Sequence, residues 1–151
     1  SPIMSSTSRT TAEWLGLCAR TESDQPHEWP FVLAVLCNRI DAKPWPDAAH
    51  EVVLEPSQFS AFNATYGDPD DRFEQARRKI ADDHSLRLAT ACAEWVLGTP
   101  AVRRPLSRRV CWFWSPRSMV PAGKTPGWAA KMRLVFAPGV DPWRFCFAEE
   151  P

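Results

Sequence analysis

The sequence predicts one α+β domain that is mainly α, with a small β appendage near its C-terminal end. In the first two thirds of the chain, apolar residues recur at helical spacing. The last third instead has short aromatic runs separated by Pro and Gly. A length of 151 residues suits one domain with one core. We expect this domain over residues 9–151, preceded by a tag remnant or disordered end over residues 1–8.

The predicted helices follow from their caps and apolar faces. Thr7 or Ser8 is expected to cap the first helix, and Pro30 suits the first turn of the second, which is apolar almost all round and should be central and buried. Between the third and fourth helices we expect an ordered loop with a short hairpin. The expected helices cover residues 9–21, 30–40, 47–54 (capped by Asp47), 69–81 (capped by Asp68) and 85–97 (ending at Gly98).

The last third is predicted to form the β appendage. Residues 108–116 read as an aromatic strand and residues 125–132 as a helical turn. Residues 133–148 read as two short strands around a Pro/Gly turn. The chain has eight Trp and eight Phe, more than a small core usually holds. We therefore expect some aromatic side chains to line a groove or an interface.

Charge is divided unevenly, although the formal net charge is zero. Residues 1–99 hold 9 basic and 15 acidic residues, whereas residues 100–151 hold 9 basic and 3 acidic. The basic part fits either an anionic polymer or the acidic half of its own fold. Binding to nucleic acid is disfavoured, because the basic run from Arg103 to Arg109 is broken by proline and has no interleaved aromatic residues.

The five cysteines lack metal-binding spacing, and four of them lie in apolar runs: Cys18, Cys37, Cys92 and Cys146. We therefore expect free, buried thiols, no disulfide, no metal and no other cofactor. The chain has no run of the ~18 apolar residues that a membrane helix requires, so no membrane insertion is expected. We expect a monomer.

Glu22, at the end of the first predicted helix, is the candidate catalytic residue. Leu15, Cys18 and Glu22 are spaced three and four apart and so share one helix face. An acid at the end of an apolar face is partly desolvated, which raises its pKa toward the value that a general acid needs. The alternative, favoured by spacing alone, is a terminal Glu turned to solvent. Asp24 and Glu28 are neighbouring candidates.

Three motifs carry a family resemblance. The segment Ala19–Glu22 precedes an apolar helix that ends in Asn38-Arg39-Ile40, and residues 45–60 read WPDAAHEVVLEPSQFS. An aromatic segment at residues 112–116 is followed by PGWA at residues 126–129. In these motifs the chain resembles the cell-wall hydrolase family typified by the spore-cortex-lytic enzyme SleB.

The resemblance extends from about Glu13 to Phe147, with three departures. Thr21 stands where the family has Gly, the linker after the acid is shortened to Ser23–Gln25, and Trp112 stands where the family often has His.

The resemblance implies a lysozyme-like, lytic-transglycosylase-like fold and cleavage of peptidoglycan between N-acetylmuramic acid and N-acetylglucosamine. It also implies that Glu22 acts alone, with Glu28 as second candidate. Glu22 would protonate the glycosidic oxygen and then take the proton of the muramic 6-hydroxyl, whose oxygen closes a 1,6-anhydro ring. Attack by water would instead give plain muramidase products.

Further residues are expected to bind this substrate. Gln58, Ser60 and Asn63 would bind sugar hydroxyl and N-acetyl groups, the alternative being local capping of their own loop. Strand alternation places Trp112 and Trp114 on one face, which we expect to line the cleft. Arg117 is a candidate partner for lactyl or stem-peptide carboxylates, unless it is simply solvated. These residues follow from the resemblance together with their chemistry.

Two functions of different classes remain open. The first is a peptidoglycan lytic transglycosylase from a phage or prophage, either an endolysin or a virion-associated lysin. Such an enzyme would be made in the cytoplasm and act on the wall or in the periplasm, or be secreted if a leader has been removed. The second is a non-catalytic peptidoglycan-binding or virion structural protein with the same fold.

Overall fold

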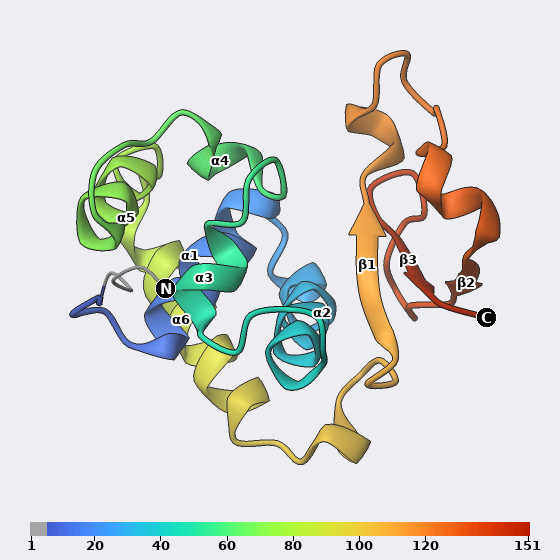
Figure 1. Cartoon of the computed structure of the whole chain (residues 1–151), viewed down its shortest axis with the longest axis horizontal. Helices are drawn as coiled ribbons and strands as arrows, with labels where there is room; N and C mark the ends of the chain where they lie inside the picture. The colour runs from blue at the N-terminus through green and yellow to red at the C-terminus, as the bar shows by residue number, and fades with distance from the viewer. Residues whose placement is uncertain (1–5) are drawn as a thin grey trace.

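A computed structural model describes residues 6–151, so residues 1–5 of the expected disordered end lie outside the described part. A layer of helices stands beside a small three-stranded sheet, and α2 lies between the other helices and β1 (Figure 1). The predicted class, α+β and mainly α, is confirmed. The helices are α1 (Thr11–Glu22), α2 (Trp29–Asp41), α3 (Ala49–Val53), α4 (Ser60–Asn63), α5 (Pro69–Arg77) and α6 (Asp83–Leu97); the strands are β1 (Val110–Trp114), β2 (Arg133–Val135) and β3 (Cys146–Glu149).

Helix α1 begins later than predicted because a stronger cap follows the expected one. The Thr10 hydroxyl accepts from Glu13 N, and the Glu13 carboxylate accepts from Thr10 N, which is a complete capping box. Thr7 and Ser8, the caps that we expected, bind the Asp70 carboxylate instead. These two residues of the expected disordered end are therefore tied to α5.

Helix α2 is the central buried helix, as predicted. Pro30 lies in its first turn, where its missing N–H removes no helical hydrogen bond. Side chains from Val32 to Arg39 are buried, and the helix packs on α1, α6, α3 and β1. Contacts on all sides explain why its sequence is apolar nearly all round.

Helices α1 and α6 are in tight contact at Gly16. A Cβ placed on Gly16 would lie 2.6 Å from Thr90 Cα, so only glycine permits this crossing. The close crossing fixes α1, which carries Glu22 at its end.

Three predictions for the middle of the chain are wrong. Helix α3 begins after Ala48 without a side-chain cap, so Asp47 does not cap it. The predicted hairpin is the short helix α4, whose Phe62 is buried against Trp14 in the core. Helix α5 is capped by Asp68 as predicted but ends at Arg77, four residues early.

The C-terminal appendage is an antiparallel sheet with strand order β1-β3-β2. Phe113 pairs with Phe147, and β1 has a register irregularity between Val110 and Trp112. Phe113 also contacts Phe59, which precedes α4, so aromatic packing joins the sheet to the helical layer.

The basic C-terminal part of the chain pairs with the acidic N-terminal part. Arg104 binds Asp41 at 2.8 Å, and Arg144 binds Glu28 and Asp24. At least part of the charge asymmetry therefore serves the fold itself. No helix within residues 6–151 is both long and apolar enough to cross a membrane.

Candidate active site

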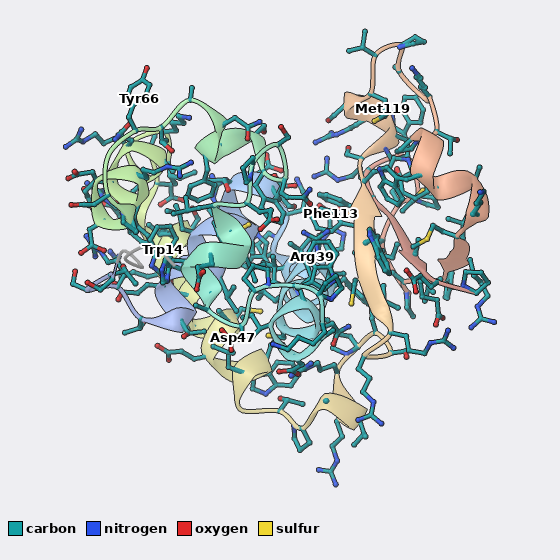
Figure 2. The ribbon with its side chains drawn as sticks, in the orientation of Figure 1. Trp14, Arg39, Asp47, Tyr66, Phe113 and Met119 are labelled. Carbon is teal, nitrogen blue, oxygen red and sulfur yellow. The ribbon has the colours of Figure 1, made fainter. Side chains whose placement is uncertain are left out.

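A cleft of about 670 Å³ lies where the helical layer meets the sheet. Arg39 of α2 and Phe113 of β1 line it from facing elements, and both are labelled in Figure 2. Six of the seven predicted site residues line this cleft: Glu22, Gln58, Ser60, Asn63, Trp114 and Arg117.

Glu22 is the last residue of α1 and is half-buried in the cleft wall. Burial raises the pKa of Glu22 from its ordinary 4.5 to about 7, although the positive charge of Arg39 opposes the rise. The carboxyl is thus protonated for a substantial fraction of the time near neutral pH, a condition for a general acid. Glu22, at the end of α1, is thus partly desolvated and partly open to the cleft.

Among the described residues that line the cleft, Glu22 is the only acidic one. Glu28, the second candidate, is fully buried outside it and is bound by Arg144 and Ser23. Burial alone would raise the pKa of Glu28, but the hydrogen bonds from Arg144 and Ser23 outweigh it and the net shift is downward. An ionised, fully hydrogen-bonded carboxylate is poorly suited to donate a proton.

Arg39 is a cleft residue whose role the sequence did not reveal. Asn38 and Arg39, near the end of α2, both bind the chain in and just before β1. Asn38 Nδ2 donates to Ser107 O and Val110 O, and Arg39 Nε donates to Cys111 O at 2.7 Å. Only the three-dimensional fold brings these carbonyl groups to the end of α2.

The guanidinium of Arg39 is held in one place. It lies 4.3 Å from the ring centre of Trp45, and Nη1 donates to Gln58 Oε1 at 3.1 Å. The side chain of Arg39 is 4% exposed. A fixed positive charge near Glu22 stabilises the carboxylate that remains after proton donation.

Gln58, Ser60 and Asn63 form a polar rim on one side of the cleft. All three are exposed, and within residues 6–151 the side chains of Ser60 and Asn63 make no hydrogen bond. The alternative of local self-capping is therefore not what the loop shows. The hydroxyl group of Ser60 and the amide group of Asn63 are therefore available to a ligand.

The opposite side of the cleft is aromatic. Trp114 and Trp128 pack edge to face with ring centres 5.6 Å apart, and both line the cleft. Trp112 does not: it packs on Trp45 instead, with ring centres 6.0 Å apart. The cleft crosses the end of β1, so it takes in consecutive residues, Phe113 and Trp114, rather than alternate ones.

Arg117 lies on the same side as Trp114 and is exposed. Its backbone N–H donates to Trp143 O at 2.9 Å, which anchors the loop, while the charged group remains open to solvent. No group of three or more His, Cys, Asp or Glu within residues 6–151 is placed to hold a metal ion.

The geometry therefore defines a cleft with one acid of raised pKa, a fixed cation, a polar rim and an aromatic wall. A family model described as Cell Wall Hydrolase matches residues 26–139, which is most of the chain. The chain belongs to this family, and membership supports an enzyme that acts on peptidoglycan. Neither the curated proteins nor the solved structures searched gave a match. The family match begins four residues after Glu22, so the role of Glu22 depends on the geometry of the cleft.

Proposed function

We propose that the chain is a peptidoglycan lytic transglycosylase in which Glu22 is the single general acid and base. The observation that carries the proposal is the lone acid: within the described residues, Glu22 is the only carboxylic acid that lines the cleft. Ordinary glycosidases use two carboxyl groups, about 5–9.5 Å apart, that flank the bond to be cleaved. A single acid requires another nucleophile, and the muramic 6-hydroxyl is one that the substrate itself carries.

The reaction has two proton transfers and one exchange of bonds at the muramic C1. Protonated Glu22 gives its proton to the glycosidic oxygen, and the C1–O bond breaks with its electron pair leaving on that oxygen. The resulting Glu22 carboxylate then takes the proton of the 6-hydroxyl, whose oxygen bonds to C1. The products are a 1,6-anhydro-muramyl end and a free N-acetylglucosamine end, and no water is consumed.

Other cleft residues suit this sequence of steps. The fixed charge of Arg39 stabilises the Glu22 carboxylate between the two transfers. Ser60 and Asn63 are open to sugar hydroxyl and N-acetyl groups, and the flat faces of Trp114 and Trp128 are open to sugar rings. The closed ion pair of Glu28 supports Glu22, rather than Glu28, as the acid.

The test is a digestion of purified peptidoglycan followed by mass spectrometry of the released muropeptides. Wild type should release anhydro-muropeptides, and Glu22→Gln should lose at least ~100-fold in rate, as expected for removal of a general acid. Glu94→Gln is a matched control, because Glu94 is an exposed acid on α6. Near-ultraviolet circular dichroism of each variant reports whether the fold is intact.

Each result discriminates between the candidate functions. Absence of product from wild type would favour the non-catalytic wall-binding or virion structural protein. Products with reducing muramic ends would identify a muramidase, in which water replaces the 6-hydroxyl. Equal activity of wild type and Glu22→Gln would place the acid elsewhere.

We also propose that the enzyme folds in a reducing cytoplasm and reaches the wall afterwards, as a phage lysin does. All five cysteines are free, and Cys18, Cys37 and Cys111 are buried. Activity should then be unaffected by the presence of a reductant during expression and assay. Loss of activity under reducing conditions would contradict this route.

A further inference from the structure

Two smaller cavities adjoin the cleft on the side of its polar rim. The first, of about 320 Å³, shares Ser57 and Asn63 with the cleft. The second, of about 290 Å³, shares Leu54, Glu55 and Arg72 with the first. We call these two cavities the side channel. The shared lining residues place both cavities directly beside the cleft, on the side of Ser57 and Asn63.

The lining of the side channel differs from that of the cleft. Leu54 and prolines supply apolar surface, while Glu51, Glu55 and Arg72 supply charge of both signs. Unlike the cleft, neither cavity is lined by a Trp or Tyr of the described residues: Phe62, which lines the first, is buried, and the ring of His50 lines the second. Short apolar surfaces mixed with opposite charges suit a peptide with small side chains, carboxylates and an amine.

The backbone at the mouth of the side channel has an unusual conformation. Ser57, which lines both the cleft and the channel, has φ 63°, a left-handed conformation that non-glycine residues seldom adopt. Such conformations cost free energy and are concentrated at binding sites. Here the turn at Ser57 directs the chain from the wall of the channel, at Glu55 and Pro56, to the polar rim of the cleft at Gln58.

We propose that the side channel binds the peptide stem of the muramyl residue held in the cleft, and this inference rests on the proposed function. The stem branches from the glycan strand at the muramyl residue, and the side channel lies beside the cleft that would hold this residue. A stem tetrapeptide extends to about 14 Å, at ~3.5 Å per residue. Glu51 and Glu55 meet the amine of the diamino acid, and Arg72 meets a stem carboxylate.

Glu55 and Glu51 are the positions to test. Neither side chain makes a hydrogen bond or ion pair within residues 6–151, so both carboxylates are open to a ligand. Arg72 is less suitable, because it donates to Thr65 Oγ1 at 2.8 Å and to Phe62 O at 3.1 Å and thereby supports the loop.

The first experiment compares two substrates: intact peptidoglycan and glycan strands whose stems have been removed by an amidase. The measured quantity is the ratio of kcat/KM on the stem-bearing substrate to that on the stem-free one. Wild type should prefer stems, and Glu55→Gln and Glu51→Gln should each lower the ratio about tenfold, the effect of one lost charge-assisted contact. Glu94→Gln, outside the channel, should keep the wild-type ratio.

The second experiment needs no catalysis. Free stem tetrapeptide is titrated into Glu22→Gln protein and followed by NMR, with saturable shifts expected in residues 54–57 and at Arg72. In the double variant Glu22→Gln, Glu55→Gln, the dissociation constant of the tetrapeptide should rise about tenfold.

The outcomes separate the two proposals. An unchanged ratio in both variants, with no peptide binding, would overturn the stem site and leave cleavage intact. Equal loss on both substrates in Glu55→Gln would place Glu55 in the cleavage chemistry and also overturn the stem site. Absence of cleavage by wild type would remove the proposed function, while the peptide titration would still decide whether the channel binds stems.

Discussion

Glu28 and Arg144 form a buried ion pair that joins the two sides of the cleft. Arg144 Nε donates to Glu28 Oε2 at 2.7 Å and Nη2 donates to Oε1 at 2.9 Å, with Glu28 fully buried and Arg144 17% exposed. Ser23, which directly follows Glu22, also donates to Glu28. Phe145, which directly follows Arg144, lines the cleft. One salt bridge therefore holds the end of α1 against the wall that carries the aromatic residues.

The first prediction concerns the loss of this pair. Glu28→Gln should lower the free energy of unfolding by about 3–5 kcal/mol at pH 7, because it leaves the Arg144 charge with only the exposed Asp24 carboxylate, 3.5 Å away, as a partner. The pKa of Glu28 is lowered in the fold, so the stabilisation is complete above the ordinary carboxyl pKa and is lost as pH falls through the folded value. Urea unfolding at pH 7 and at pH 3 measures both effects.

Activity distinguishes this structural role from a catalytic one. Folded Glu28→Gln should retain cleavage with an unchanged basic limb of the pH–rate profile. A double-mutant cycle with Arg144→Met should show a coupling energy above ~1 kcal/mol. Full loss of activity with no loss of stability would instead make Glu28 the acid.

Much of the helical layer was predictable because it depends on local signals. The all-round apolar sequence of α2 and the Asp68 cap predicted two helices correctly. The cap of α1 was placed too early because the sequence offers several hydroxyl residues in succession. The structure selects Thr10, the one with Glu three residues later.

The site was only partly predictable because it depends on contacts between distant segments. The spacing of Glu22 on α1 suggested its burial, but nothing local shows that Arg39 meets the carbonyl group of Cys111 or that Arg144 closes on Glu28. Strand alternation places Trp112 and Trp114 on the same face of β1. Trp112 nevertheless does not line the cleft, because the cleft lies at the end of the strand, beside Trp114.

The second prediction is a pH dependence of activity. Since burial raises the pKa of Glu22 to about 7, kcat/KM should fall about tenfold per pH unit above this value as the proton donor is lost. In folded Arg39→Met the basic limb of the pH–rate profile should move to higher pH, because the positive charge that lowers the Glu22 pKa is gone. A basic limb near pH 5 in wild type would contradict the assignment of Glu22.

The third prediction concerns stability and tests the same carboxyl without an activity assay. The folded pKa of Glu22 lies above its ordinary 4.5, so the folded state holds the proton more tightly and stability falls as pH rises from about 4.5 to 7. The shift from 4.5 to about 7 corresponds to a penalty of ~3.4 kcal/mol at pH 8, which solvent screening at the half-buried Glu22 reduces. Glu22→Gln removes this penalty and should raise the free energy of unfolding by about 2 kcal/mol at pH 8. Urea unfolding at pH 4 should show little difference from wild type. Equal effects at both pH values would show that the pKa of Glu22 is not raised.

The fourth prediction contrasts two tryptophans of β1. Trp114→Ala removes a face of the cleft and should raise KM for glycan strands about tenfold, at the upper end of the contribution of an aromatic contact. Trp112→Ala removes packing on Trp45 and should lower stability while leaving KM near that of wild type. Steady-state kinetics on soluble glycan fragments, with urea unfolding of both variants, measures the contrast. Equal increases in KM would show that both rings contact substrate.

The last prediction follows from the crossing of α1 and α6. In Gly16→Ala the added Cβ would lie 2.6 Å from the Thr90 backbone, so the helices must separate, at a cost of about 1–3 kcal/mol. Gly127→Ala is the control, since a Cβ there meets no atom within 4 Å and should change stability by under ~0.5 kcal/mol. Because Glu22 ends α1, separation of the helices should also lower kcat in Gly16→Ala. Unfolding and kinetics of the two alanine variants measure this, and a neutral Gly16→Ala would show that the crossing can relax without cost.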